Sequence, residues 1–123
     1  IIGTIAFNPA FAGPKKEWQK KYPEWGAFRE DSINKFKKAD TINAIVFAHK
    51  DDIFEDPKTL SFFENFKDLN LIDYSELKPT KCTWADVDEK MTVDKGHNIP
   101  QSKCFTNYLE EKNYLISFLE NIL

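Results

Sequence analysis

Two short, nearly continuous apolar runs constrain the fold of this chain more than any other feature. The first is IIGTIAF at residues 1–7, and the second is TINAIVFA at residues 41–48. An Asn-Pro pair ends the first run, and the polar segment HKDD ends the second. Runs of this length between breakers favour strands over helices. Because neither run alternates with polar residues, we expect both strands to be covered on both faces, as in a parallel sheet.

The other patterned segments alternate between helix and strand. Apolar residues at helical spacing predict helices, and period-two alternation predicts a half-buried strand. An Asp followed by Pro is a typical helix start. The predicted elements are a short helix within residues 15–23, a helix over 27–38, a helix that begins at Asp56-Pro57, an edge strand over 69–74, a long polar loop over 75–95 and a helix over 105–123.

This order of elements predicts an α/β fold with a parallel sheet and helices on both faces. The length of 123 residues favours one domain over residues 1–123. Three strands make a thin sheet, however, and the two apolar strands need neighbours. Since the chain begins at Ile1 and its only methionine is Met91, we expect it to be the C-terminal part of a larger domain.

Composition limits the kinds of partner and the cellular compartment that we expect for this chain. The 17 basic and 20 acidic side chains are interspersed, so we expect neither nucleic acid nor an anionic membrane as a partner. No signal-peptide pattern precedes the first strand, and we expect a cytoplasmic protein. Cys82 and Cys104 have no metal-ligand spacing. They could form a disulfide, but the prediction is two reduced thiols.

Chemically useful side chains follow the predicted strands. Functional groups in open α/β sheets gather beyond the carboxyl ends of the strands. The chain has two histidines, and both lie in such places. His49 directly follows the second apolar run, beside Asp51 and Asp52, and His97 belongs to a Gly-His pair that ends the long loop.

These motifs, in this order, resemble the C-terminal half of an α/β-hydrolase. A strand that runs into AHKDDIF, then a helix, a strand, a loop with Gly-His and a final helix is similar to dienelactone-hydrolase-like members of that family. The segment IAFNPAFAG resembles their small-residue loop. The resemblance covers nearly the whole chain. It implies a serine-type hydrolase that cleaves an ester, lactone or related acyl bond of a small molecule, without a metal or organic cofactor.

Carried over residue by residue, the resemblance places the acid at Asp52 and the base at His97. A carboxylate on one ring nitrogen holds a histidine in the tautomer and orientation that accept a proton from the nucleophile. The order acid then base also matches the family order of nucleophile, acid, base. No G-x-S-x-G motif occurs here. We therefore expect the nucleophile and oxyanion hole in a missing N-terminal part of the same protein, and an inactive isolated chain.

Several alternatives stay open. The acid could be Asp51 through a shift of one residue, and His49 is expected to be structural. A metal site formed by both histidines and both aspartates meets no recognised ligand spacing, and Cys104 is expected to be a buried thiol rather than a nucleophile. The rival function is a small non-catalytic α/β domain that binds a ligand or a protein, which the missing nucleophile supports.

Overall fold

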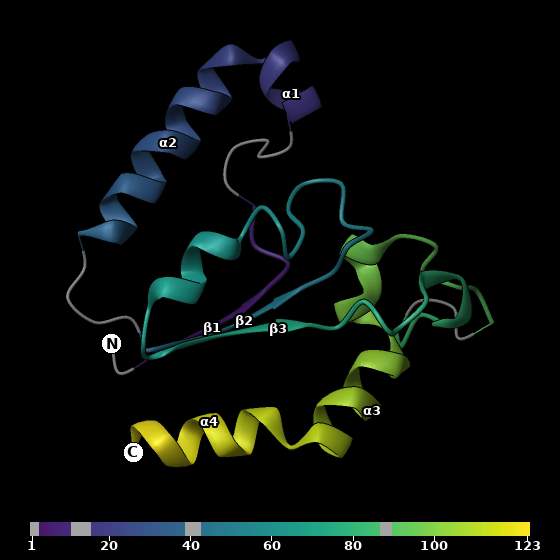
Figure 1. Ribbon diagram of the computed structural model, residues 1–123. Coiled ribbons are helices and arrows are strands. Elements are labelled where there is room, and N and C mark those ends of the chain that lie inside the picture. Colours follow the sequence, from purple (N-terminus) through teal and green to yellow (C-terminus); the bar gives the residue numbers. More distant parts are fainter. Residues whose placement is uncertain (1–2, 11–15, 39–42, 87–89) are drawn as a thin grey trace.

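The computed structural model describes residues 3–10, 16–38, 43–86 and 90–123 (Figure 1). Within these ranges the chain alternates between strands and helices. In chain order the elements are β1 (Thr4–Phe7), α1 (Lys16–Lys21), α2 (Pro23–Lys37), β2 (Ala44–Ala48), the 3-10 helix η1 (Ser61–Asn65), β3 (Leu69–Asp73), the 3-10 helices η2 (Pro79–Lys81) and η3 (Gly96–Gln101), α3 (Lys103–Lys112) and α4 (Tyr114–Ile122).

The three strands form one parallel sheet in the order β1-β2-β3. In its register Ala6 is paired with Val46, and Val46 with Leu71. All three strands point the same way, so their carboxyl ends meet at one edge of the sheet (Figure 1). The predicted α/β arrangement with a parallel sheet is confirmed, as is the position of β3 at an edge.

Strand β2 is buried on both faces, as its apolar run predicts. Ile45 and Phe47 point to one core, and Val46 and its neighbouring alanines point to the other. Figure 1 shows α3 and α4 on one side of the sheet and η1 and α2 on the opposite side. The first core adds Tyr74, Cys82, Val93, Ile99, Phe105, Tyr108 and Phe118, and the second adds Leu60, Phe63 and Leu69.

Strand β1 lacks the burial that its sequence predicts. Ile5 is 39% exposed and Phe7 is 43% exposed. Within the described residues β1 pairs with β2 alone, so it forms the second edge of the sheet. An apolar run reports the chemistry of a strand but not whether its neighbours are present, which is why this prediction is wrong. The first two residues of the run lie outside the described ranges.

The helix predicted from Asp56 is also wrong. Asp56 and Thr59 do form a reciprocal turn, but only the short η1 follows it. The carbonyl of Thr59 accepts from Arg29 of α2 at 2.9 Å, and the N–H of Phe63 donates to Leu60 instead. One i to i−4 bond does form, from the N–H of Leu60 to the carbonyl of Asp56 at 3.2 Å, but the bonds that follow span three residues, as in a 3-10 helix.

The helix predicted over residues 105–123 is two helices. Asn113 adopts a left-handed conformation with φ of 56°, which ends α3 and precedes α4. Asparagine tolerates this conformation better than most residues. Helices are confirmed within 15–23 and 27–38, although α2 begins earlier, at Pro23. None of the helices in the described ranges has both the length and the apolar character needed to cross a membrane.

Candidate functional site

Asp52 lies in a tight turn directly after β2. Its N–H donates to the carbonyl of His49 at 3.1 Å, which closes the turn. The side chain is fully buried, and its Oδ1 accepts a hydrogen bond from the N–H of Phe54 at 2.9 Å. A buried carboxylate needs such donors, because desolvation opposes its charge. The turn therefore fixes the direction in which this carboxylate points.

His97 is the second donor to that carboxylate. Its Nδ1 lies 3.1 Å from both Oδ1 and Oδ2 of Asp52. Since an ionised carboxylate only accepts, Nδ1 carries the hydrogen of this contact. The His97 side chain is 39% exposed, and no described residue hydrogen-bonds its Nε2. The structure thus brings together the residues predicted as acid and base, and it leaves Nε2 available.

Gly96 packs directly against the turn over residues 49–52, called the acid turn below because it carries the predicted acid Asp52. A Cβ at this position would lie 2.8 Å from the carbonyl carbon of Asp51, 2.9 Å from Nδ1 of His49 and 3.0 Å from the backbone nitrogen of Asp52. Two of these atoms belong to the backbone and cannot move aside cheaply. Only glycine therefore allows His97, the next residue, to approach Asp52.

We expect Gly96→Ala to separate His97 from Asp52 and to destabilise the fold by about 1–3 kcal/mol, the usual cost of overpacking. Gly26→Ala is the matched control, because its new Cβ would meet only the side chain of Gln19 at 3.3 Å or more. Since Gly26 lies inside α2, this control is expected to stabilise the helix by about 0.5–1 kcal/mol. Urea denaturation measures both changes. Equal unfolding free energies would contradict the packing role of Gly96.

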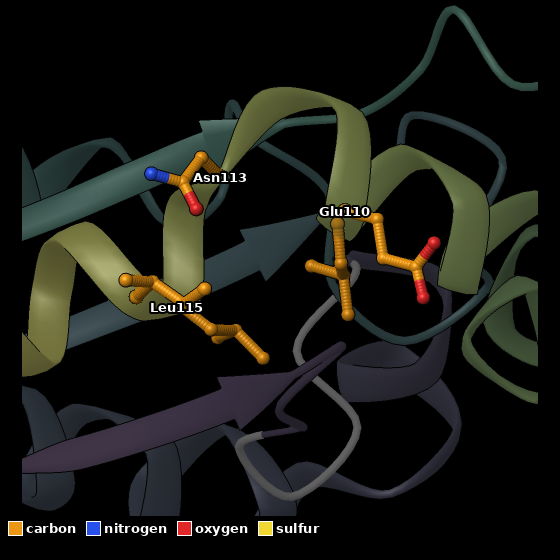
Figure 2. Close-up of a pocket in the computed structure, with 5 residues that line it drawn as sticks. Glu110, Asn113 and Leu115 are labelled. Atoms are coloured by element: carbon orange, nitrogen blue, oxygen red, sulfur yellow. The ribbon is translucent and has the colours of Figure 1, made fainter.

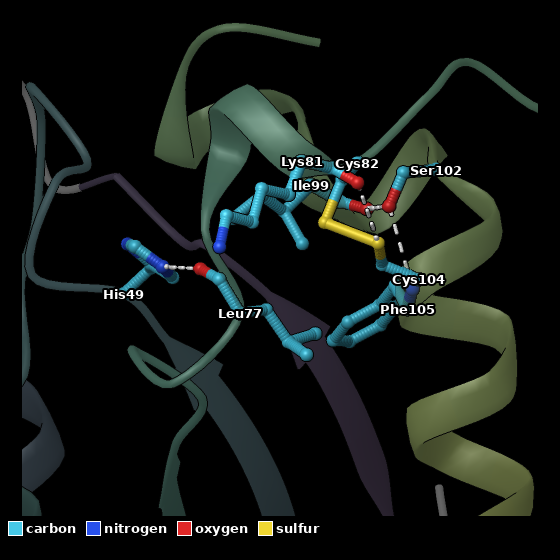
Figure 3. The surroundings of a disulfide bond; sticks show 8 residues. All are labelled: His49, Leu77, Lys81, Cys82, Ile99, Ser102, Cys104 and Phe105. Carbon is cyan, nitrogen blue, oxygen red and sulfur yellow. Dashed lines mark hydrogen bonds between the residues drawn. A yellow bond between two sulfur atoms is a disulfide. The ribbon is translucent and has the colours of Figure 1, made fainter. Parts of the chain in front are cut away.

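His49 is structural, as the sequence predicts. It is fully buried, and its Nδ1 accepts from the N–H of Asp51 at 3.0 Å. Its Nε2 therefore carries the hydrogen and donates to the carbonyl of Leu77 at 2.7 Å (Figure 3). Because both ring nitrogens are engaged, His49 orders the turn and does not reach a substrate.

Asn8 and Tyr74 join the site, and sequence reasoning missed both roles. Asn8 follows β1, is 4% exposed and donates from Nδ2 to the carbonyls of Gly96 and His97. Its Oδ1 accepts from the hydroxyl of Tyr74, which follows β3. The only sequence signal was position, since Asn8 follows the first apolar run and Tyr74 is the last residue of the strand predicted over 69–74. That signal places a residue at the correct edge but does not reveal its partner.

Cys82 and Cys104 form a disulfide (Figure 3), so the prediction of reduced thiols is wrong. Their Cα atoms lie 5.4 Å apart, within the usual range for such a bond. The bond joins the segment after η2 to the first turn of α3, and it closes a loop that contains Gly96 and His97. A separation of 22 residues could not reveal this proximity. The bond also removes Cys104 as a candidate nucleophile.

All five serines lie in the described ranges, and none of them is hydrogen-bonded to His97. Four of the hydroxyls have other partners: Ser32 donates to the Phe28 carbonyl, Ser75 bonds Asp73, Ser102 donates to the Ile99 carbonyl and Ser117 accepts from Asn113. Among the described residues, no three His, Cys, Asp or Glu side chains are grouped so that they could hold a metal ion. Within the described residues, Asp52 and His97 therefore lie together with no serine hydroxyl bonded to His97.

A separate pocket of about 320 Å³ lies where α3 meets α4 (Figure 2). Its lining is mostly apolar and consists of Leu109, Glu110, Asn113, Leu115 and Ile116. None of these residues belongs to the Asp52–His97 site. The pocket is thus a feature of the helix corner and does not define a substrate cavity for that site.

Comparison of the chain with known protein families, with curated proteins and with solved structures gave no match. A function for this chain is therefore inferred from the geometry of the Asp52–His97 pair and of the residues around it.

Proposed function

We propose that this chain provides the acid and the base of a serine-type hydrolase that cleaves an ester, lactone or related acyl bond of a small molecule. The observation that supports this most is the contact between fully buried Asp52 and half-exposed His97. In a triad, such a carboxylate orients the imidazole, and the opposite ring nitrogen faces the nucleophile. The geometry of this pair supports the same division of roles.

In the proposed reaction, Nε2 of His97 removes the hydroxyl proton as the nucleophile oxygen attacks the acyl carbon. The imidazolium then gives that proton to the leaving group, and the bond between the acyl carbon and the leaving group breaks. The acyl group stays bound to the nucleophile oxygen as an acyl-enzyme. Water attacks the acyl-enzyme in the same way and releases the acid. Throughout, the Nδ1–H of His97 stays bonded to Asp52, whose buried negative charge stabilises the imidazolium more strongly than it would in water.

The nucleophile and the oxyanion hole belong, under this proposal, to an N-terminal part of the same protein. The open side of β1 supports that assignment, because β1 pairs with β2 alone within the described residues. Apolar Ile5 and Phe7 are partly exposed beside this edge. An unpaired strand edge is a template for another strand. We assign this edge to the strand that leads to the nucleophile, in keeping with the resemblance to α/β-hydrolases.

The disulfide bears on the compartment. Disulfides persist in oxidising compartments and are rare in the cytosol, where thiols are kept reduced. The Cys82–Cys104 bond therefore weighs against the expected cytoplasmic location and favours an oxidising compartment for the folded protein.

A fluorophosphonate probe tests the proposed function, because it reacts with a serine that a neighbouring base activates. We expect the longer protein that contains residues 1–123 to be labelled at one serine outside this range. His97→Ala is expected to slow labelling by about 1,000-fold or more, because the general base is lost. The control is Lys95→Ala, which removes an exposed side chain from the same loop. Mass spectrometry of the digested protein identifies the labelled serine.

Two results would contradict the proposed function. One is labelling that His97→Ala does not slow. The other is the absence of both labelling and ester hydrolysis in the longer protein, which would favour the non-catalytic binding domain.

A further inference from the structure

The side chain of Asn8 reaches from the end of β1 to the loop that carries the base. Its Nδ2 donates to the carbonyl oxygen of Gly96 at 3.2 Å and to that of His97 at 3.1 Å. These two carbonyls flank the backbone of His97 and therefore set the direction of its side chain. We propose that Asn8 is a positioning residue that holds His97 against Asp52, a role that rests on the proposed function.

The backbone of Asn8 suits this role. Its φ is 47°, a left-handed conformation that asparagine tolerates and most residues avoid. Its N–H donates to the carbonyl of Phe47 at 2.9 Å, so its main chain is fixed to β2. The acid turn begins at the end of the same strand. Asn8 therefore places the base relative to the strand that also places the acid.

The orientation of the Asn8 amide follows from its partners. Carbonyl oxygens only accept, so Nδ2 must face the loop, and Oδ1 must face the hydroxyl of Tyr74. Burial raises the pKa of Tyr74 far above its ordinary value, so the hydroxyl keeps its proton and donates. The N–H of Tyr74 donates to the carbonyl of Ala48 at 3.1 Å. Asn8 and Tyr74, bonded to each other and each to the backbone of β2, thus form a clamp that joins the ends of all three strands.

The role of Asn8 predicts a specific kinetic effect. A misplacement of about 1 Å in a catalytic group can cost about 100-fold in rate. Asn8 contacts the backbone of the base and is itself buried, so its loss is expected to affect the chemical step rather than substrate binding. Activity should then fall through kcat while KM stays nearly constant.

Asn8→Asp tests the role, because it keeps the size, the positive φ and the acceptor for Tyr74 but removes the two donors. In the wild type, ring ¹⁵N shifts are expected to show neutral His97 as the Nδ1–H tautomer. In Asn8→Asp this preference should be lost, and kcat for a small ester should fall about 100-fold. Val46→Ala, a core truncation on the other face of the sheet, is the control for lost stability. It should keep the tautomer.

Should Asn8→Asp fail to fold, Asn8→Gly provides the same test, because glycine accepts the positive φ and also lacks the donors. The inference is overturned if either variant keeps the Nδ1–H tautomer and loses no more kcat than Val46→Ala. These measurements use the longer protein that contains residues 1–123, and if its wild type hydrolyses no ester, the proposed function fails by itself. The tautomer measurement then still decides whether Asn8 positions His97.

Discussion

Replacement of Asp52 by asparagine is expected to lower kcat of the proposed hydrolysis by about 10,000-fold, the loss seen when the acid of a known triad is replaced in this way. The N–H of Phe54 already donates to Oδ1 of Asp52, so the oxygen of the new amide would stay there. Its NH2 group would then face Nδ1 of His97. A donor at this position favours the tautomer that carries its hydrogen on Nε2. That nitrogen could no longer accept the proton of the nucleophile.

Asp51→Asn is the matched control for this change. It makes the same chemical substitution one residue earlier, at an exposed side chain. We expect it to change kcat by about twofold or less, which is typical of surface substitutions. Steady-state hydrolysis of a small aryl ester by the longer protein measures both variants. A larger loss of kcat in Asp51→Asn than in Asp52→Asn would assign the acid to Asp51. An unchanged kcat in Asp52→Asn would show that Asp52 is not the acid.

The contact between Asp52 and His97 was expected from the resemblance together with the order of the elements. TINAIVFA has the pattern of a strand buried on both faces, and its polar end places Asp52 at the carboxyl edge of the sheet. Gly96 makes the approach of His97 sterically feasible. Parallel strands bring such ends together. Strand patterns placed Asp52 at the edge of the sheet, and the resemblance to α/β-hydrolases, rather than any local pattern, paired it with His97.

The clamp and the disulfide could not be predicted, because each depends on contacts between residues far apart in the chain. Asn8 lies 88 residues before Gly96, and nothing near either residue indicates the other. The two cysteines meet only because the long loop folds back on α3. Local patterns place residues on elements and edges, whereas such pairings are set by how loops pack. Burial of β1 was mispredicted for the same reason.

A buried ion pair joins α2 to the segment after the acid turn. Nη1 of Arg29 contacts Oε1 of Glu55, which is fully buried. Thr59 completes the cluster, because its hydroxyl donates to Oε2 of Glu55 at 2.6 Å. Glu55 follows Asp52 by only a few residues. This pair therefore connects α2 to the segment that directly follows the turn of Asp52.

Arg29→Met is expected to destabilise the protein by about 3–5 kcal/mol, because it removes the cation that contacts the buried carboxylate of Glu55. Methionine retains much of the apolar stem, so lost packing contributes less. Lys35→Met in the same helix is the control. Its partner Asp31 lies 2.9 Å away, and both side chains are largely exposed, so the expected cost is about 0.5 kcal/mol or less. Urea denaturation of the full chain measures both.

A second substitution separates the unpaired charge from the lost contacts. In Arg29→Met combined with Glu55→Leu, neither charge of this pair remains, and the hydroxyl of Thr59 can still donate to the carbonyl of Asp56 at 2.9 Å. Apolar replacement of a whole buried pair is often neutral or stabilising. We therefore expect the double variant to recover most of the stability lost by Arg29→Met. A double variant as unstable as the single one would show that the contacts of the ion pair, rather than the buried charge of Glu55, determine the cost.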